Sequence, residues 1–207
     1  MIKGIIFDLG GVLLRTEDRT PRQQLAEDLG VTVEQLYDLI FNSESAHLAT
    51  LGEVTSEQHW ESIQQKMKWS AAELSEVRSK FWSGDRLDML LIDYLRQLRA
   101  GRKTALLSNA WDDLRNFIEE QWKFGDAFDE IIISAEVGAA KPSPEIYLLA
   151  LQRLGLHPQE AVFVDDVMEN LVGAQAVGLH TIHFTGSQSA INQLADLMEQ
   201  QECSSLR

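Results

Sequence analysis

The stretch Ile5-Ile6-Phe7-Asp8-Leu9-Gly10-Gly11-Val12-Leu13-Leu14 decides the fold of this chain. Apolar residues run directly into one carboxylate, and two glycines follow it. This pattern predicts a buried strand that ends at Asp8 and passes into a tight loop. Ligands of open α/β sheets bind outside the carboxyl ends of the strands, so Asp8 is a candidate nucleophile or metal ligand. The alternative is an aspartate that caps the turn after a strand, where Asp is common.

The composition is that of a globular protein with a substantial core. Of the 207 residues, 44% are hydrophobic and 24% are charged, which allows one domain with an insertion or two small domains. The net charge of −14 argues against nucleic acid and anionic membrane surfaces as partners. Cys203 is the single cysteine, so no intrachain disulfide is possible. With no signal-peptide or membrane-span pattern either, we expect a cytoplasmic protein, monomer or homodimer.

Residues 20–84 show helix signals and no convincing strand pattern. Thr20-Pro21 resembles an N-cap followed by proline at the first helical position. Three later segments fit capping boxes that precede apolar stripes, namely Thr32–Gln35, Thr55–Gln58 and Ser70–Glu73. The sequence therefore predicts a helical insertion, preceded by a polar flap at residues 15–19.

Strand and helix patterns alternate from Asp85 onward. Such alternation with continuous apolar strands predicts an α/β fold, in which a parallel sheet is covered on both faces. The predicted strands span residues 104–107, 131–133, 161–164 and 180–184. The predicted helices span residues 87–98, 111–121, 145–154, 170–177 and 191–200.

Polar residues stand where several of these strands end. Asp8 follows the first strand, Ser108-Asn109 the second, and Asp165-Asp166 the fourth, while Lys141 lies in the loop after the third. The carboxyl ends of parallel strands share one edge of a sheet, so these groups should meet in one crevice. For each residue alone, an ordinary role as a helix cap or a solvated charge competes.

The pieces at these positions resemble the four motifs of the haloacid dehalogenase-like hydrolase superfamily, in order and spacing. They are Phe7-Asp8-Leu9-Gly10-Gly11-Val12-Leu13, Leu106-Leu107-Ser108-Asn109, Gly138-Ala139-Ala140-Lys141-Pro142-Ser143-Pro144 and Val162-Phe163-Val164-Asp165-Asp166-Val167-Met168-Glu169-Asn170. The resemblance implies a Rossmann-like three-layer core at residues 1–15 and 85–207. It also implies an inserted all-helical cap domain at residues 16–84.

This resemblance further implies a Mg²⁺-dependent phosphatase that acts on a small phosphorylated metabolite. Asp8 would attack phosphorus and form an aspartyl-phosphate, which water then hydrolyses. The metal ligands would be Asp8, Asp166 and the carbonyl of Gly10. Asp165 would lie in the outer shell or complete the coordination of the metal.

The resemblance assigns the transferring phosphoryl group to three further side chains. Ser108, Asn109 and Lys141 would hold this group, and Lys141 would also offset the charge of Asp8. Positioning and electrostatics of this kind account for most of phosphoryl-transfer catalysis.

The chain departs from the phosphatase pattern at Gly10. Phosphatases of the family usually carry a second aspartate there, which protonates the leaving alcohol, and such acid-base catalysis contributes about 10²–10⁴-fold. Its absence predicts a slow enzyme, a good leaving group or an acid from elsewhere. Glu17 and Asp18 on the flap are candidates for this acid, although solvated charges are the favoured interpretation. Some family members with glycine here resemble sugar phosphatases, notably bacterial alpha-glucose-1-phosphate phosphatase, so a sugar phosphate is one candidate substrate.

Two other functions stay open at this point. One is a metal-independent 2-haloacid dehalogenase, against which the acidic pair Asp165-Asp166 argues. The other is a catalytically weak protein that binds phosphorylated ligands, which the glycine at position 10 favours. The five histidines show no zinc-ligand spacing. Trp60, Trp69 and Trp82 are expected in the core of the cap, although one of them could line the pocket.

Overall fold

The computed structural model describes the backbone of residues 1–204 and the side chains of residues 1–200, so the thiol of Cys203 lies outside the described part. The centre of the protein is a five-stranded parallel sheet with the strand order β5-β4-β1-β6-β7. These strands are β1 (Gly4–Phe7), β4 (Lys103–Ser108), β5 (Glu130–Ile133), β6 (Ala161–Asp165) and β7 (His180–His183). The predicted α/β fold is therefore confirmed.

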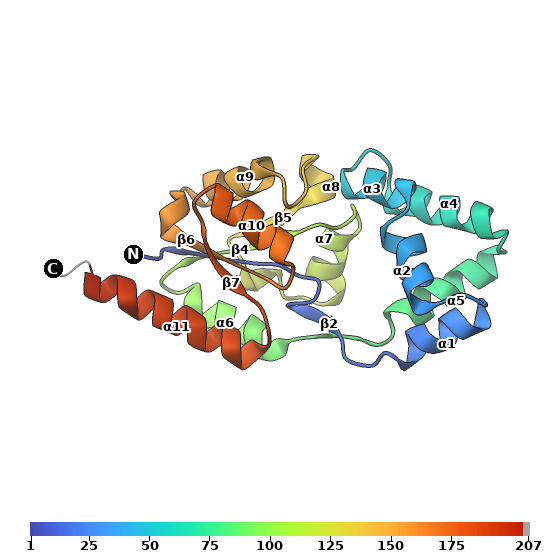
Figure 1. Cartoon of the computed structure of the whole chain (residues 1–207), viewed down its shortest axis with the longest axis horizontal. Helices are drawn as coiled ribbons and strands as arrows, with labels where there is room; N and C mark the ends of the chain where they lie inside the picture. Colours follow the sequence, from blue (N-terminus) through green and yellow to red (C-terminus); the bar gives the residue numbers. More distant parts are fainter. Residues whose placement is uncertain (205–207) are drawn as a thin grey trace.

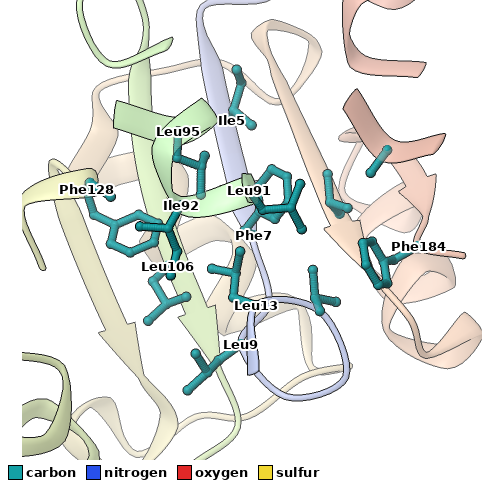
Figure 2. Packing of buried hydrophobic residues seen from close by; sticks show 14 of the residues in the cluster. Ile5, Phe7, Leu9, Leu13, Leu91, Ile92, Leu95, Leu106, Phe128 and Phe184 are labelled. Carbon is teal, nitrogen blue, oxygen red and sulfur yellow. The ribbon is translucent and has the colours of Figure 1, made fainter. Parts of the chain in front are cut away.

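Side chains of the strands alternate between two apolar cores on opposite faces of the sheet. Phe7 and Leu106 point into one core, and Ile6 and Phe163 into the other. The first core is closed by α6 (Met89–Leu98) and α11 (Ser187–Ser204), and the second by α9 (Pro144–Leu154) and α10 (Met168–Ala176). Figure 2 shows the first core, where Leu91, Ile92 and Leu95 of α6 lie over β1 and β4. The result is the expected three-layer arrangement.

Residues 20–82 form a helical cap beside this core (Figure 1). Its helices are α1 (Thr20–Asp28), α2 (Val33–Phe41), α3 (Glu44–Thr50), α4 (Ser56–Met67) and α5 (Ala71–Trp82). All three expected capping boxes are present, at Thr32, Thr55 and Ser70. The expected cap at Thr20 is wrong, because Thr20 is itself helical and its backbone N–H donates to Asp18 Oδ1 over 2.9 Å. Helix α3 was not predicted from the sequence.

The two chain segments that join cap and core lie against each other. Strand β2 (Leu14–Thr16) pairs antiparallel with β3 (Asp85–Leu87), and the backbone N–H groups of Glu17 and Asp18 donate to the Gly84 carbonyl. The prediction of Leu87 in a helix is therefore wrong. Asp88 begins α6 instead, since its Oδ1 accepts from the backbone N–H of Leu91 over 3.0 Å.

The remaining differences from the predicted elements are short helices. In place of one helix over 111–121, the chain forms α7 (Leu114–Asn116) and a π-helix (Phe117–Gln121). Helix α8 (Ser134–Val137) and two 3₁₀ turns (Gly125–Ala127 and Pro158–Glu160) were not predicted, and α11 begins before the predicted Ile191. Among the described residues, no helix combines the length and the apolar character that a bilayer crossing requires.

Candidate active site

Three neighbouring central strands bring the predicted site residues together. Asp8 directly follows β1, with Ser108 at the end of β4 on one side and Asp165 at the end of β6 on the other. The backbone N–H of Asp8 donates to the Val164 carbonyl over 2.9 Å, which continues the β1–β6 ladder up to the candidate nucleophile. Asp8, Ser108 and Asp165 are all buried. In Figure 1 the carboxyl ends of these strands face the cap.

Lys141 links the ends of β1 and β6 by its ammonium group. Its Nζ lies 2.7 Å from Asp8 Oδ1 and 2.7 Å from Asp165 Oδ2, and its side chain is 1% exposed. An ammonium group with two carboxylate partners makes charge-assisted hydrogen bonds that fix both carboxylates in place. The side chain of Lys141 is thus a local positive charge that touches the candidate nucleophile.

The side chain of Asn109 binds the backbone of the loop that carries Lys141. Its Oδ1 accepts from the Lys141 backbone N–H over 2.8 Å, and its Nδ2 donates to the Lys141 carbonyl over 2.8 Å. The amide therefore positions Lys141, and its expected role as a phosphate ligand stays a prediction, because Nδ2 carries a second N–H. The hydroxyl of Ser108, by contrast, makes no hydrogen bond to another residue in the described part of the chain.

Asp165 is completely buried, and its oxygens are already bonded within the protein. Beyond Lys141, Oδ1 accepts from the backbone N–H of Val167 over 2.7 Å, and Oδ2 accepts from Asn170 Nδ2 over 3.0 Å. The Tyr147 hydroxyl donates in turn to the Asn170 carbonyl over 2.7 Å. Sequence reasoning gave Asn170 no role, although this residue ends the fourth motif, and it missed Tyr147, because neither residue stands at a strand end.

The three carboxylates form a cluster that suits a divalent cation. One oxygen each from Asp8, Asp165 and Asp166 lies within 4.8 Å of the other two. Asp166 Oδ1 is buried and has no hydrogen-bond partner, which is costly unless a ligand supplies one. The donor set is all oxygen, as Mg²⁺ prefers. Asp8 and Asp166 therefore fit as direct ligands, whereas Asp165 fits the outer position because its oxygens are bonded elsewhere.

The electrostatics of the cluster point the same way. Burial raises the pKa of Asp8 to about 6, although Lys141 opposes the shift, and the charge of Asp165 adds to it. Burial and the charge of Asp165 also raise the pKa of Asp166. Three carboxylates face one ammonium group, so the site favours a bound cation, which lowers the pKa of its ligands.

Gly11 makes room for this cluster. Its φ of +76° is a conformation that favours glycine, and a Cβ there would lie 2.1 Å from Asp166 Oδ2. Gly10, whose carbonyl is an expected metal ligand, is exposed, and a Cβ on it would meet nothing within 4 Å. The position of the missing acid is therefore physically open to a side chain.

The surrounding polar groups offer few replacements for that acid. Hydrogen bonds from Thr20 lower the pKa of Asp18, which makes it a poor proton donor at neutral pH. Glu17 is exposed on the flap. His183 was set aside from the sequence, yet its Nε2 lies 3.1 Å from the Asp166 carbonyl oxygen, so β7 reaches the edge of the site.

Comparison with known proteins gives one consistent result. The model of the haloacid dehalogenase-like hydrolases matches residues 2–178. A sesquiterpene phosphatase of Aspergillus oryzae is 28% identical over 95% of this chain and 96% of its own. The D-ribitol-5-phosphate phosphatase of Bacteroides thetaiotaomicron is 28% identical over 87% and 91%. An enzyme of this family from the latter organism, solved with magnesium and inorganic phosphate, has a TM-score of 0.76 at 25% identity, covering 90% of this chain and 96% of the other. The chain belongs to the family of haloacid dehalogenase-like hydrolases.

Proposed function

We propose that this protein is a cytoplasmic, Mg²⁺-dependent phosphatase that hydrolyses a small phosphorylated metabolite through an aspartyl-phosphate on Asp8. The observation that carries the proposal is the contact of Lys141 Nζ with both Asp8 and Asp165, beside the unpartnered buried oxygen of Asp166. The names of two relatives over nearly the whole chain support it. Residues 1–15 and 85–207 would be the hydrolase core, and residues 16–84 the cap domain.

Asp8, Asp166 and the carbonyl of Gly10 would hold the metal, with Asp165 behind them. When bound, Mg²⁺ would neutralise charge on the carboxylates and on the phosphate oxygens. Lys141 already offsets part of the charge of Asp8, which matters because one anion must approach another. The Ser108 hydroxyl is the free donor at the end of β4 and would bind a phosphate oxygen.

The reaction would proceed in two displacements at phosphorus. A carboxylate oxygen of Asp8 forms a bond to phosphorus while the bond to the ester oxygen breaks, and the leaving group takes up a proton. Water then attacks the phosphoryl group on Asp8, which releases inorganic phosphate and restores the carboxylate. No side chain at Gly10 can deliver the proton in the first displacement, so the leaving group must be a good one or must take its proton from water.

The test is phosphate release from a panel of sugar phosphates, nucleotides and an activated aryl phosphate, with Mg²⁺ and with a chelator. We expect metal-dependent release that Asp8→Asn abolishes, whereas Asp196→Asn, an exposed aspartate on α11, leaves it unchanged. The intact mass of acid-quenched enzyme should show one added phosphoryl group in the wild type alone.

The other outcomes identify the competing functions. Halide release from a 2-haloacid without metal would establish a dehalogenase. No turnover of any compound, with Mg²⁺ and phosphate still bound, would mean a binding protein and refute the proposal.

A further inference from the structure

Three aromatic rings form a continuous strip from the core to the cap. The ring of Trp111 lies 6.0 Å from that of Phe41, and the ring of Phe41 lies 5.8 Å from that of Trp82. Trp111 stands three residues after Ser108, in the loop that leaves the catalytic edge. Phe41 ends α2, the helix on the side of the cap nearest the core in Figure 1. Trp111, Phe41 and Trp82 are called the aromatic strip below.

The strip differs from the aromatic core of the cap by its exposure. Trp60 and Phe81 are 1% and 0% exposed, whereas Trp82 is 39% exposed, and Phe41 and Trp111 are partly buried. Three neighbouring aromatic side chains that are left partly in water form a candidate contact surface.

Arg22 packs its guanidinium against Trp82 of the strip and against the neighbouring ring of Phe81. Its guanidinium lies 4.2 Å from the Phe81 ring centroid and 5.7 Å from that of Trp82. Every nitrogen of the guanidinium has a partner, and these partners are the Phe81 carbonyl, the Tyr37 hydroxyl and the Asp85 carboxylate. Arg22 therefore packs against these aromatic rings, and four of its five N–H donors are already used within the protein.

The loop of Trp111 is tied to the cap. Asp112 Oδ1 accepts from the backbone N–H of Ser56, the first residue of α4, over 2.8 Å. The Trp111 ring also packs 4.6 Å from His59, a buried residue of the cap. The strip is thus a preformed surface, and binding to it requires little ordering of side chains.

Apolar side chains also follow the catalytic carboxylate on the core side. Val167 and Met168 come directly after Asp166 and are 44% and 56% exposed. A chain with a net charge of −14 thus exposes apolar side chains directly after one carboxylate of its cluster.

We propose that the aromatic strip binds an extended apolar organic group of the phosphate monoester, as in an isoprenoid or alkylaryl phosphate, and so determines specificity. This inference rests on the proposed phosphatase function. Gly10 adds independent weight for the aryl case, because a phenolate leaves phosphorus with less help from an acid than a simple alkoxide does. Sugar selectivity, by contrast, requires polar side chains that pair with hydroxyl groups. The strip offers mainly ring faces, so the substrate class favoured here is apolar and not a sugar.

The experiment uses 4-alkylphenyl phosphates from methyl to hexyl, whose leaving groups have nearly the same pKa but different apolar area. For the wild type with Mg²⁺, we expect KM to fall by about threefold for each of the first few methylene groups added to the alkyl chain, while kcat stays nearly constant. Trp82→Ala should raise KM for the hexyl ester by about tenfold and flatten the series. Trp82→Phe should restore most of the dependence of KM on the length of the alkyl chain.

The matched control is Trp69→Ala. Trp69 belongs to the turn between α4 and α5. Figure 1 shows this turn at the end of the cap away from the core, so the substitution should leave the series unchanged. If the wild type shows turnover whose KM does not depend on chain length, or if Trp82→Ala and Trp69→Ala behave alike, the apolar assignment is wrong and the phosphatase function stands. If no ester releases phosphate, the phosphatase function itself fails.

Discussion

Replacing Asp8 by asparagine should stabilise the metal-free protein at neutral pH, although it removes the proposed nucleophile. The pKa of Asp8 rises from its usual value of 3.8 to about 6 in the fold, chiefly through burial. The folded protein thus holds this proton more tightly than the unfolded chain does, so stability falls as the pH rises from about 4 to about 6 and stays lower above that. One pKa unit corresponds to about 1.4 kcal/mol, which puts the cost of ionised Asp8 at about 3 kcal/mol.

Thermal unfolding in the presence of a chelator measures this cost. For a domain of this size, about 3 kcal/mol corresponds to a melting temperature about 6–12 °C higher for Asp8→Asn at pH 7.5. The difference should vanish near pH 4, where the wild-type carboxyl is protonated, and should shrink or reverse with saturating Mg²⁺. Asp196→Asn should not shift the melting temperature at any pH. Equal stability of Asp8→Asn and the wild type at pH 7.5 would refute the reasoning, because it would mean that Lys141 fully compensates the buried charge.

Three further predictions concern the segment between β1 and α1. Gly10→Asp should raise kcat for simple alkyl phosphates by about a hundredfold or more, since the position is open, while the uncharged control Gly10→Asn should not. An equal increase in kcat for both variants would show that the wild type is not limited by the missing proton donor at position 10. Glu17→Ala and Asp18→Ala should keep full turnover, because these side chains are solvated or already hydrogen-bonded. A tenfold loss in kcat for either variant would show that this flap residue is the proton donor. Gly11→Ala should weaken Mg²⁺ binding in calorimetry, because its Cβ would displace the Asp166 carboxylate, and unchanged affinity would contradict this geometry.

The parts of the fold that follow from local patterns were predictable from the sequence. The strands are continuous apolar runs, and the capping boxes at Thr32, Thr55 and Ser70 are fixed by residues three apart. Helix α3 was missed because it has only seven residues and shows little periodicity beyond its N-cap Ser43. Leu87 was assigned to a helix because β3 exists only through pairing with β2, which lies some 70 residues earlier in the chain.

The candidate site shows the same division. Strand order places Asp8, Ser108 and Asp165 at one edge, and this follows from the alternation of strands and helices. Which oxygen is bonded and which is free depends on neighbours that are distant in sequence. The contact of Asn109 with the backbone of Lys141 belongs to that class, as does the unpartnered oxygen of Asp166, and no spacing rule reveals either.

The central place of β1 has a consequence for how the chain folds during its synthesis. Gly4 pairs with Lys103 on one side and with Ala161 on the other, so the strand emerges from the ribosome long before either neighbour exists. The cap helices make mostly short-range contacts and can form in that interval. One edge of β1 therefore stays unpaired until about half of the chain has been made, and the other until about three-quarters, so β1 is the segment for which a chaperone would have most use.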